Sequence, residues 1–457
     1  MTNTRLPSNL RCMAFRPSWV RPGREPLCRR HFREHSEIRT CINSRQRVRS
    51  SRSNSNLLAT DYSARAPRNG EWCSMRLAAC IVVVAALALG EASAAAAPSA
   101  VPGTALSITP QPGGWRGMSG GEVVRYWTTG SDGAPRPASG AVFVPPGPAP
   151  AGGWPILVFE HGTRGLGPGC GGQAAPERAP FGKALEGEDR ILRHFVSKGF
   201  AVVAPDYLGL GVFDTGPHPY LELTTEVSAT LDLLRVARAA HPRLSRTWMV
   251  LGGSQGGQAA LGIAHRQRNL MPELNFRGAV AIDPESDVEH LLPAAGPWGP
   301  DLPGEIGDAL TAAVASILAG LRAARPDARV DDYLTPRGRR LLDGIGRLCL
   351  DAIVTRVHGI GIGDVLSKSL GDTHFRAALA DYMGVPTGGF DAPILLLINA
   401  TDLAVPSPLH AALAAQLAAN HVRYRMVVGT GAHVQLNAAM WSALDCFLDE
   451  VRASVPS

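Results

Sequence analysis

Short apolar runs rich in β-forming residues alternate with segments of helical periodicity through most of the chain. Buried strands of a parallel sheet have this continuous apolar pattern, and helices connect one such strand to the next. The first two predicted strands are expected to open a mostly parallel α/β sheet in antiparallel fashion. The runs predict strands at residues 123–129, 141–144, 156–159, 201–204, 247–251, 280–282, 394–398 and 425–428, and the periodic segments predict helices at 191–196, 227–240, 258–268, 409–419 and 438–451.

One stretch, approximately residues 287–390, interrupts this alternation. It is rich in proline and glycine and contains an apolar helix at 309–321. The alternation of strands and helices predicts the α/β-hydrolase layout. An insertion at this place, between a late strand and the loop after the next strand, is expected to form a helical cap over the active site. The apolar face of the cap helix either binds an acyl chain of the substrate or packs against the core, and the sequence leaves both readings open.

The segment 75–97 has the order of a secretory signal peptide. Met75 and Arg76 precede an apolar run at 77–89, and small residues including Ala94 and Ala97 follow it. Thirteen apolar residues are too few to span a bilayer. We therefore expect cleavage after Ala94 or Ala97, a folded domain at 98–457, and a secreted protein that is periplasmic if the host has an outer membrane.

Residues 1–74 carry the basic charge of the chain. They hold 15 Arg, no Lys and 5 acidic side chains, so this leader is +10 while the remainder is −4 (6 − 10). A basic arm can bind nucleic acid or act in targeting, but this one lacks hydrophobic periodicity and precedes a complete signal peptide. We expect translation to begin at Met75, with a disordered extension as the alternative, and we expect no nucleic-acid partner.

Only three of the eight cysteines, Cys170, Cys349 and Cys446, follow the signal segment. Export makes a disulfide plausible. Cys170 and Cys349 fall in a loop and in the insertion, and we expect them to be bridged, whereas Cys446 lies among apolar residues of the last helix and is expected to be buried. No spacing typical of a metal site and no nucleotide or flavin motif is present, so no metal and no cofactor are expected.

The motif Gly252-Gly253-Ser254-Gln255-Gly256 follows a predicted strand and precedes a predicted helix. A G-x-S-x-G nucleophile elbow needs this context, because the serine sits on a strained strand-to-helix turn that lifts its Oγ above the sheet. The same pattern occurs around Ser119, but there a glycine-rich loop precedes it and a strand follows. We therefore predict Ser254 as the nucleophile and assign Ser119 to a loop.

A serine hydroxyl needs a histidine base, and a carboxylate must orient that histidine. Asp402 follows the strand at 394–398, and His433 lies 31 residues later in a glycine-rich loop before the last helix. The order Ser, Asp, His is that of the α/β-hydrolase fold. Other acids that follow an earlier strand are Asp283, Glu285 and Asp287, of which Asp283 is the best alternative, and the remaining histidines considered, namely His358, His374, His410 and His421, are interpreted as surface or packing residues.

Two backbone N–H groups must stabilise the oxyanion that develops on the substrate. The residue after the nucleophile, Gln255, supplies the first. The loop after the strand at 156–159 supplies the second, for which we choose Thr163, with Gly162 as the near alternative. His161 in the same loop is expected to order the loop instead of transferring protons.

Several of these motifs together resemble secretory lipases of the α/β-hydrolase superfamily. The motifs are His161-Gly162-Thr163 with Cys170, the segment 204–211 containing Asp206 and Tyr207, the segment 231–235, the elbow at Ser254 and the late cap. The resemblance implies a secreted carboxylic ester hydrolase, often acting on triacylglycerols, with Ser254, Asp402 and His433 as the triad. Asp206 and Tyr207 are interpreted as structural residues of the pocket wall. Gly253 stands where relatives commonly carry His or Tyr, and we expect this smaller residue to loosen the packing of the elbow.

We therefore expect a lipase or esterase whose partner is an acyl-ester or lipid substrate, with transient contact to a lipid interface and no stable membrane span. A secreted serine peptidase on the same fold is one alternative, because Glu222, Glu226 or Asp287 would suit a substrate amine. An esterase acting on a polymer or polysaccharide is a second alternative. A binding protein without activity is a third, although such proteins have usually lost a triad member.

Overall fold

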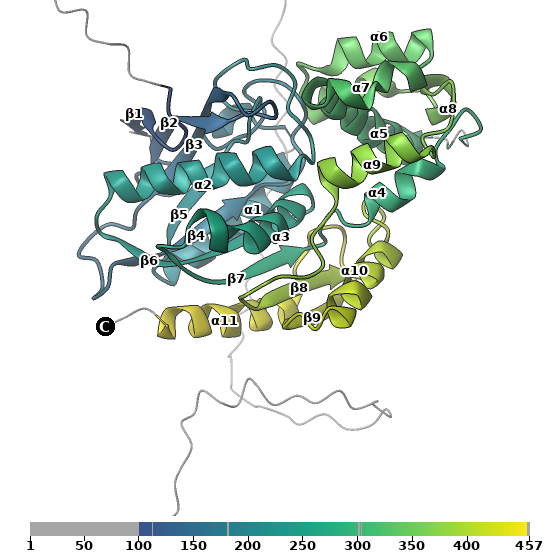
Figure 1. Ribbon diagram of the computed structural model, residues 1–457. Coiled ribbons are helices and arrows are strands. Elements are labelled where there is room, and N and C mark those ends of the chain that lie inside the picture. The colour runs from purple at the N-terminus through teal and green to yellow at the C-terminus, as the bar shows by residue number, and fades with distance from the viewer. Residues whose placement is uncertain (1–99, 112, 181, 300–301, 303, 455–457) are drawn as a thin grey trace, which may run out of the picture. The chain divides into compact units, whose positions relative to one another are not determined.

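A nine-stranded sheet in the order β1-β2-β3-β5-β4-β6-β7-β8-β9 forms the centre of the protein (Figure 1). The computed structural model describes residues 100–457 except 112, 181, 300–301, 303 and 455–457. The leader and signal peptide predicted at 1–74 and 75–97 lie outside the described residues. The strands are β1 (Ala105–Pro110), β2 (Glu122–Thr129), β3 (Pro135–Phe143), β4 (Trp154–Glu160), β5 (Ala201–Pro205), β6 (Leu244–Gly253), β7 (Asn275–Ile282), β8 (Ile394–Asn399) and β9 (Tyr424–Gly429).

The sheet changes from antiparallel to parallel at β5. The pairs β1–β2, β2–β3 and β3–β5 are antiparallel, and all pairs from β5 through β4, β6, β7 and β8 to β9 are parallel. The carboxyl ends of the parallel strands consequently meet at one edge of the sheet. Ser254, Asp283 and Asp402 follow β6, β7 and β8 and are therefore brought to this edge.

Helices cover both faces of the sheet, so the central strands are buried on both sides. In β6, Met249 and Leu251 pack with α1 (Gly182–Ser197) and α11 (Ala438–Ala453). The alternate residues Trp248 and Val250 pack with the other face, which α2 (Leu223–Ala240) and α3 (Gln255–Leu270) cover. α10 (Ser407–Ala419) packs beside β8. Burial on both faces explains why these strands appear in the sequence as continuous apolar runs.

The segment between β7 and β8 forms a helical cap with its own hydrophobic core. The cap and the sheet are joined by the predicted disulfide between Cys170, in the loop region after β4, and Cys349, with an S–S distance of 2.03 Å. The cap contains α4 (Val288–Leu291), α5 (Gly304–Ala324), α6 (Pro336–Ile345), α7 (Leu350–Val357), α8 (Ile362–Val365) and α9 (Thr373–Met383), with 3₁₀ turns at Leu292–Ala294, Pro326–Ala328 and Val330–Tyr333.

Helix α5 is long and apolar enough to cross a membrane, and it is the one helix of the described residues that is. More than half of this apolar stretch is buried inside the protein. Its residues Ala315, Leu318 and Leu321 belong to the core of the cap. The apolar character of α5 therefore follows from its central position in the cap.

The predicted α/β-hydrolase class is confirmed, and several element predictions need correction. β1 was not predicted, because its residues are exposed or half-buried and form no apolar run. α1 begins at Gly182, well before the predicted residue 191. The sequence did not indicate its first half because that half is polar. The cap contains several short helices besides the predicted one. Cys446 is half-buried in α11, where the prediction was a buried side chain.

Candidate active site

Ser254 occupies the turn between β6 and α3 in a strained conformation. Its φ of 57° and ψ of −124° are rare for a residue with a side chain. This conformation costs free energy and persists only where the surrounding structure enforces it. Its backbone N–H donates to the Ile282 carbonyl at 2.9 Å, and its carbonyl accepts from the Glu285 N–H at 3.1 Å. Both bonds come from the end of β7, so the neighbouring strand helps to hold the turn.

The glycines around Ser254 are required by close backbone contacts. A Cβ atom on Gly252 would lie 2.1 Å from the Gly256 carbonyl oxygen, and a Cβ on Gly256 would lie 2.1 Å from the Glu160 carbonyl oxygen. Side chains at these two positions would therefore push α3 away from β4 and β6. In the second sequence match, Ser119 is exposed in a turn before β2, and no strand-to-helix turn is present there.

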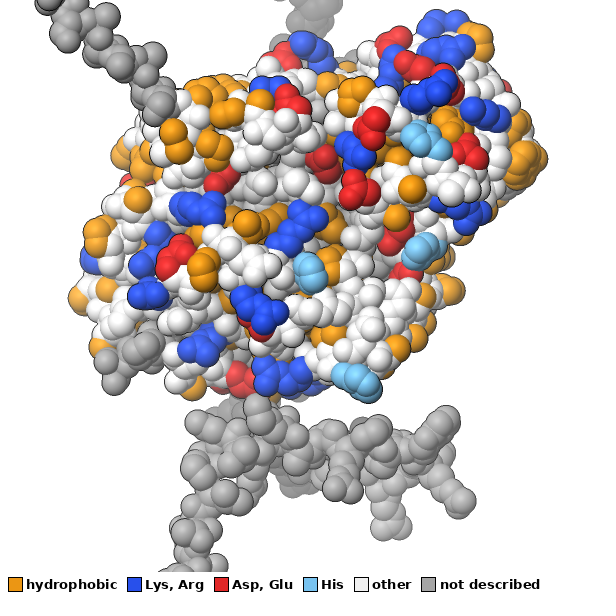
Figure 2. Space-filling model, viewed as in Figure 1, with side chains coloured by type: hydrophobic (Ala, Val, Ile, Leu, Met, Phe, Trp, Pro, Cys, Tyr) orange, Lys and Arg blue, Asp and Glu red, His pale blue; other side chains and the backbone are white. Residues whose placement is uncertain are grey.

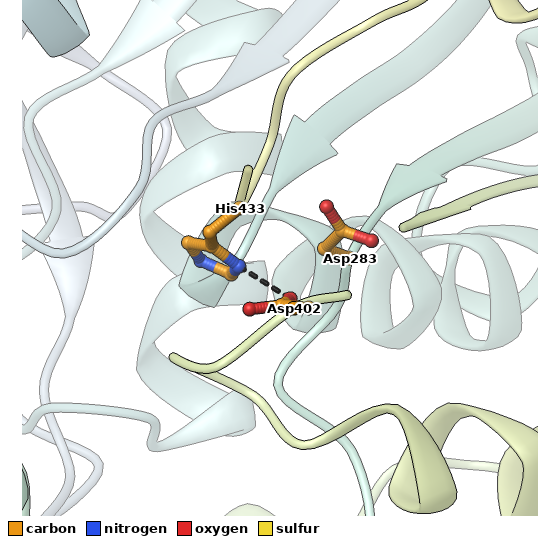
Figure 3. Close-up of side chains that lie close together, drawn as sticks. All are labelled: Asp283, Asp402 and His433. Carbon is orange, nitrogen blue, oxygen red and sulfur yellow. Dashed lines mark hydrogen bonds and ion pairs between the residues drawn. The ribbon is translucent and has the colours of Figure 1, made fainter. Parts of the chain in front are cut away.

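His433 lies in the loop after β9 and is hydrogen-bonded to Asp402 (Figure 3). The distance from His433 Nδ1 to Asp402 Oδ2 is 2.6 Å. Burial alone would lower the pKa of His433, but the hydrogen bond and charge of Asp402 raise it above the ordinary value. A carboxylate in this position fixes the tautomer in which Nε2 is free to accept a proton.

Asp402 is buried and is held by several donors. Its Oδ1 accepts from the N–H groups of Ala404 at 2.8 Å and Val405 at 3.2 Å. His410 Nε2 lies 3.5 Å from Oδ2, the same oxygen that bonds His433. Burial alone would raise the pKa of Asp402, but the contacts with His410 and His433 hold it well below its usual range. The carboxylate is therefore ionised throughout the physiological pH range.

His410 was interpreted from the sequence as a surface or packing residue, and that interpretation was incomplete. It is almost fully buried on α10 and faces Asp402. No sequence motif identifies this role, because the contact depends on how α10 packs after the loop that carries Asp402.

Asp283, the alternative acid, is hydrogen-bonded to residues of the two neighbouring loops and makes no hydrogen bond to His433. Its carboxylate accepts from the Asn399 backbone N–H at 2.6 Å, from Asn399 Nδ2 at 2.7 Å and from the Val434 N–H at 2.8 Å. These bonds connect the end of β7 with the loops that carry Asp402 and His433. Asp283 thus positions the two loops, whereas Asp402 is the partner of the histidine (Figure 3).

One oxygen or nitrogen from each of Asp283, Asp402 and His433 lies within 4.8 Å of the others, a spacing short enough to consider a metal ion. The donors already bound to both carboxylates argue against that use, since Asp283 accepts from three N–H groups and Asp402 accepts from His433 and two backbone N–H groups. A metal would have to displace these bonds. The cluster fits a hydrogen-bonded histidine and carboxylate better than a metal centre.

Gly253 brings the nucleophile and the histidine loop together. A Cβ atom on Gly253 would lie 2.4 Å from Val434 Cγ1. The residue before Ser254 and the residue after His433 are therefore in contact. The expectation that a glycine at 253 loosens the elbow is wrong, because the Val434 side chain fills the space that a larger residue would take.

The loop after β4 lies against Ser254. A Cβ atom on Gly162 would be 3.8 Å from the Ser254 Cβ. Among the residues that the structure describes, neither the Thr163 nor the Gln255 backbone N–H has a hydrogen-bond acceptor. Gln255 is buried and Thr163 is half-buried. Two backbone N–H groups without an acceptor in the described part of the fold, close to a serine side chain, form a candidate anion-binding site.

His161 makes contacts that order this loop, as expected. Its Nδ1 lies 2.7 Å from the Gly162 carbonyl and its Nε2 lies 3.3 Å from the Asp206 carbonyl. Burial, and then the charge of Arg164, lowers the pKa of His161 to about 4. Asp206 is also structural, because it accepts from Ser139 Oγ and the Gln173 N–H, each at 2.7 Å.

Two buried acids lie behind the elbow. Burial raises the pKa of Glu160 to about 8 and holds the pKa of Glu226 well above its usual value. Glu226 Oε1 accepts from the Gln255 side-chain amide at 2.7 Å, and Thr230 Oγ1 donates to Glu160 Oε2 at 3.2 Å. Sequence reasoning had not assigned Glu160 a role.

The model of the secretory lipase family matches residues 182–368. The matched stretch contains Ser254 and most of the cap, but neither Asp402 nor His433. Over this stretch the chain is similar to secretory lipases, and this similarity indicates a carboxylic ester hydrolase. A comparison with curated protein sequences gives no match.

Solved structures of lipases and esterases share the fold of this hydrolase. The rice cell wall degrading esterase LipA from Xanthomonas oryzae is 21% identical, with a TM-score of 0.59 over 78% of this chain and 97% of that chain. Lipase A from Candida antarctica in its closed state is 15% identical, with a TM-score of 0.60 over 78% of this chain and 84% of that chain. A hydrolase of Legionella pneumophila is 20% identical, with a TM-score of 0.59 over 74% of this chain and 90% of that chain.

Proposed function

We propose that this ester hydrolase is a secreted lipase or esterase that cleaves acyl esters of the triacylglycerol type through an acyl-enzyme intermediate on Ser254. The observation that carries the proposal is the contact between the turn that contains Ser254 and the loop that contains His433. Ser254 lies in a strained turn beside the loop that carries His433, and His433 is hydrogen-bonded to the buried Asp402. This is the set of groups that activates a serine hydroxyl.

In the acylation half of the reaction, His433 Nε2 takes the proton of the Ser254 hydroxyl as Oγ attacks the ester carbonyl carbon. Asp402 stabilises the imidazolium that forms. His433 then gives the proton to the alkoxy oxygen of the tetrahedral intermediate, the carbon–oxygen bond breaks, and the alcohol leaves with an acyl group on Ser254.

In the deacylation half, His433 removes a proton from water, and the resulting hydroxyl attacks the acyl carbon. The proton returns to Ser254 Oγ as the acid leaves. In both halves the oxyanion accepts from the backbone N–H groups of Gln255 and Thr163, which have no other acceptor among the described residues. A donor of this kind contributes about 3 kcal/mol to transition-state stabilisation.

An apolar substrate and an exported enzyme fit two further features. The Leu403 side chain, directly after Asp402, is 85% exposed, and the cap exposes Trp298, Ile306 and Leu310. Several exposed apolar side chains suit transient contact with a lipid interface. The Cys170–Cys349 disulfide fits an oxidising compartment outside the cytosol, either the medium or a periplasm.

The peptidase alternative loses support from the positions of the acids that would bind a substrate amine. Glu226 is fully buried and bonded to Gln255, Asp287 accepts from Gln416 Nε2 at 2.7 Å, and Glu222 accepts from Ser131 Oγ at 2.6 Å. Each acid already has a partner in the fold. An esterase acting on a polymer or polysaccharide remains the second candidate, since the Xanthomonas oryzae neighbour is described as a cell wall degrading esterase.

The experiment that tests the proposal is a rate series on p-nitrophenyl esters of increasing chain length and on emulsified triacylglycerol. Ser254→Ala serves as the inactive variant and Ser119→Ala as the matched control. Activity on long chains and on the emulsion that disappears only in Ser254→Ala supports a lipase. Activity confined to short soluble esters supports an esterase instead, and equal losses in the two variants contradict the assignment of Ser254.

A further inference from the structure

Residues 218–226, which lead into α2 and form its first turn, contact both loops that carry the oxyanion donors. His218 and Glu226 bind the side chain of Gln255, and Tyr220 binds the side chain of Thr163. None of the three contacting residues belongs to the strand-end loops that carry Ser254, Asp402 and His433.

The Gln255 side chain is fixed by two acceptors. Its Nε2 lies 2.8 Å from His218 Nε2 and 2.7 Å from Glu226 Oε1. His218 Nδ1 lies 2.8 Å from the Leu208 carbonyl, which can only accept, so Nδ1 carries the hydrogen and Nε2 is the acceptor. Burial lowers the pKa of His218 to about 3, which keeps the ring neutral. Both hydrogens of the Gln255 amide are therefore used, and the residue is held in one orientation.

The Thr163 side chain is fixed through the hydroxyl of Tyr220. That hydroxyl donates to Glu285 Oε1 at 2.7 Å, and its oxygen therefore accepts from Thr163 Oγ1 at 2.9 Å. The backbone N–H of Glu285 in turn donates to the Ser254 carbonyl at 3.1 Å. A continuous chain of hydrogen bonds thus connects the nucleophile turn with the loop that supplies the second donor.

The cap packs directly on these residues. Tyr220 belongs to the hydrophobic core of the cap. A Cβ atom on Gly320 of α5 would lie 2.6 Å from the Tyr220 backbone nitrogen and 3.1 Å from the His218 carbonyl oxygen. The close contact with α5 therefore holds the backbone of His218 and Tyr220 in place.

We propose that residues 218–226 are a positioning element for the oxyanion site, in which His218 and Glu226 set the Gln255 donor and Tyr220, with Glu285, sets the Thr163 donor. The inference rests on the proposed function, because it takes Gln255 and Thr163 as the donors. None of these four side chains takes part in the proton transfers. They act by holding two N–H groups where the oxyanion forms, since preorganised donors lower the barrier without reorganisation during the reaction.

The first test compares Tyr220→Phe with Tyr382→Phe. Both tyrosines are almost fully buried in the cap core, but the Tyr382 hydroxyl has no hydrogen-bond partner among the described residues. We expect Tyr220→Phe to lower kcat about tenfold, part of the full effect of one oxyanion donor, with KM nearly unchanged. A boronic acid inhibitor should bind more weakly by the same factor. Tyr382→Phe should change neither quantity.

The second test uses Thr163, where two substitutions separate the hydroxyl from the side-chain shape. Thr163→Ser keeps a hydroxyl that can bond to Tyr220, whereas the isosteric Thr163→Val removes it. The kcat of Thr163→Val should therefore be lower than that of Thr163→Ser by about the factor that Tyr220→Phe shows. This pair also decides the matter if Tyr220→Phe fails to fold.

A Tyr220→Phe enzyme with wild-type kcat and inhibitor affinity, or equal kcat in Thr163→Ser and Thr163→Val, would overturn the inference. Ser254→Ala, measured in parallel, keeps the two proposals apart. If Ser254→Ala is still active, the proposed function itself fails. If it is inactive while the positioning variants behave as wild type, only the positioning inference fails.

Discussion

The Val434 side chain occupies the space beside Gly253, with Cγ1 2.4 Å from the position that a Cβ atom on Gly253 would take. One of these residues precedes Ser254 and the other follows His433, so their contact sets the spacing between nucleophile and base. We predict that Gly253→Ala lowers kcat and costs about 1–3 kcal/mol of stability through overpacking. The double variant Gly253→Ala/Val434→Ala should recover much of both, because it removes the clashing methyl group. Kinetics and thermal unfolding of Gly253→Ala, Val434→Ala and the double variant test this, and losses that add in the double variant would contradict the contact.

Changing Asp402 to asparagine is predicted to affect mainly kcat, whereas changing Asp283 to asparagine is predicted to affect mainly stability. Asp402→Asn should lower kcat about 10⁴-fold with little loss of stability, since the wrong tautomer of His433 is favoured. Asp283→Asn places an amide against the donors of Asn399 and Val434 and should cost about 1–3 kcal/mol of stability, with a smaller fall in kcat. Steady-state kinetics and thermal unfolding test both. A large kcat loss in Asp283→Asn at an unchanged Tm would instead favour Asp283 as the acid.

The decrease of kcat/KM at low pH is predicted to follow the protonation of His433. The base must be neutral to act, and its pKa lies above the ordinary 6.5 because the contact with Asp402, helped by the charges of Asp283 and Glu285, outweighs burial. Therefore kcat/KM should fall as the pH drops through this raised value. Glu285→Gln removes one negative charge and keeps an acceptor for Tyr220, so this decrease should move to lower pH by about half a unit at low salt. A shift to higher pH would contradict the assignment of the base.

Glu160 is predicted to make the fold less stable as the pH rises. Burial raises its folded pKa to about 8 from the ordinary value of 4.5, so the folded state keeps a proton that the unfolded state has lost. The contribution of Glu160 to the free energy of unfolding should therefore be fully present below the unfolded pKa, and it should be lost as the pH rises from about 4.5 to about 8. Glu160→Gln should remove the share of Glu160 from the slope in thermal unfolding measured across that range. A smaller slope should remain, because burial also raises the pKa of Glu226 and of Asp206. Asp445→Asn, at a partly exposed surface position, is the control, and an unchanged slope in Glu160→Gln would refute the prediction.

Local sequence patterns predicted the parts of the fold that follow from local rules. Continuous apolar runs identified the parallel strands because those strands are buried on both faces, and the elbow motif placed Ser254 because the strand-to-helix turn requires glycines at Gly252 and Gly256. The exposed strand β1 and the polar first half of α1 left no such pattern.

Side-chain roles that depend on distant packing could not be predicted. His410 faces Asp402 only because α10 packs beneath that loop, and Tyr220 reaches Thr163 across 57 residues of sequence. The contact between Gly253 and Val434 reverses the expected effect of the glycine for the same reason, since the residue that fills the space is remote in the chain.

Covalent labelling with a p-nitrophenyl alkylphosphonate, followed by peptide mass spectrometry, tests the central claim most directly. The reagent should form one adduct, on the peptide that contains Ser254, with loss of esterase activity in proportion to labelling. Ser254→Ala should be unlabelled and inactive, and Ser119→Ala should label as the wild type. An adduct at Ser119, or hydrolysis that persists in Ser254→Ala, would contradict the claim that Ser254 is the nucleophile.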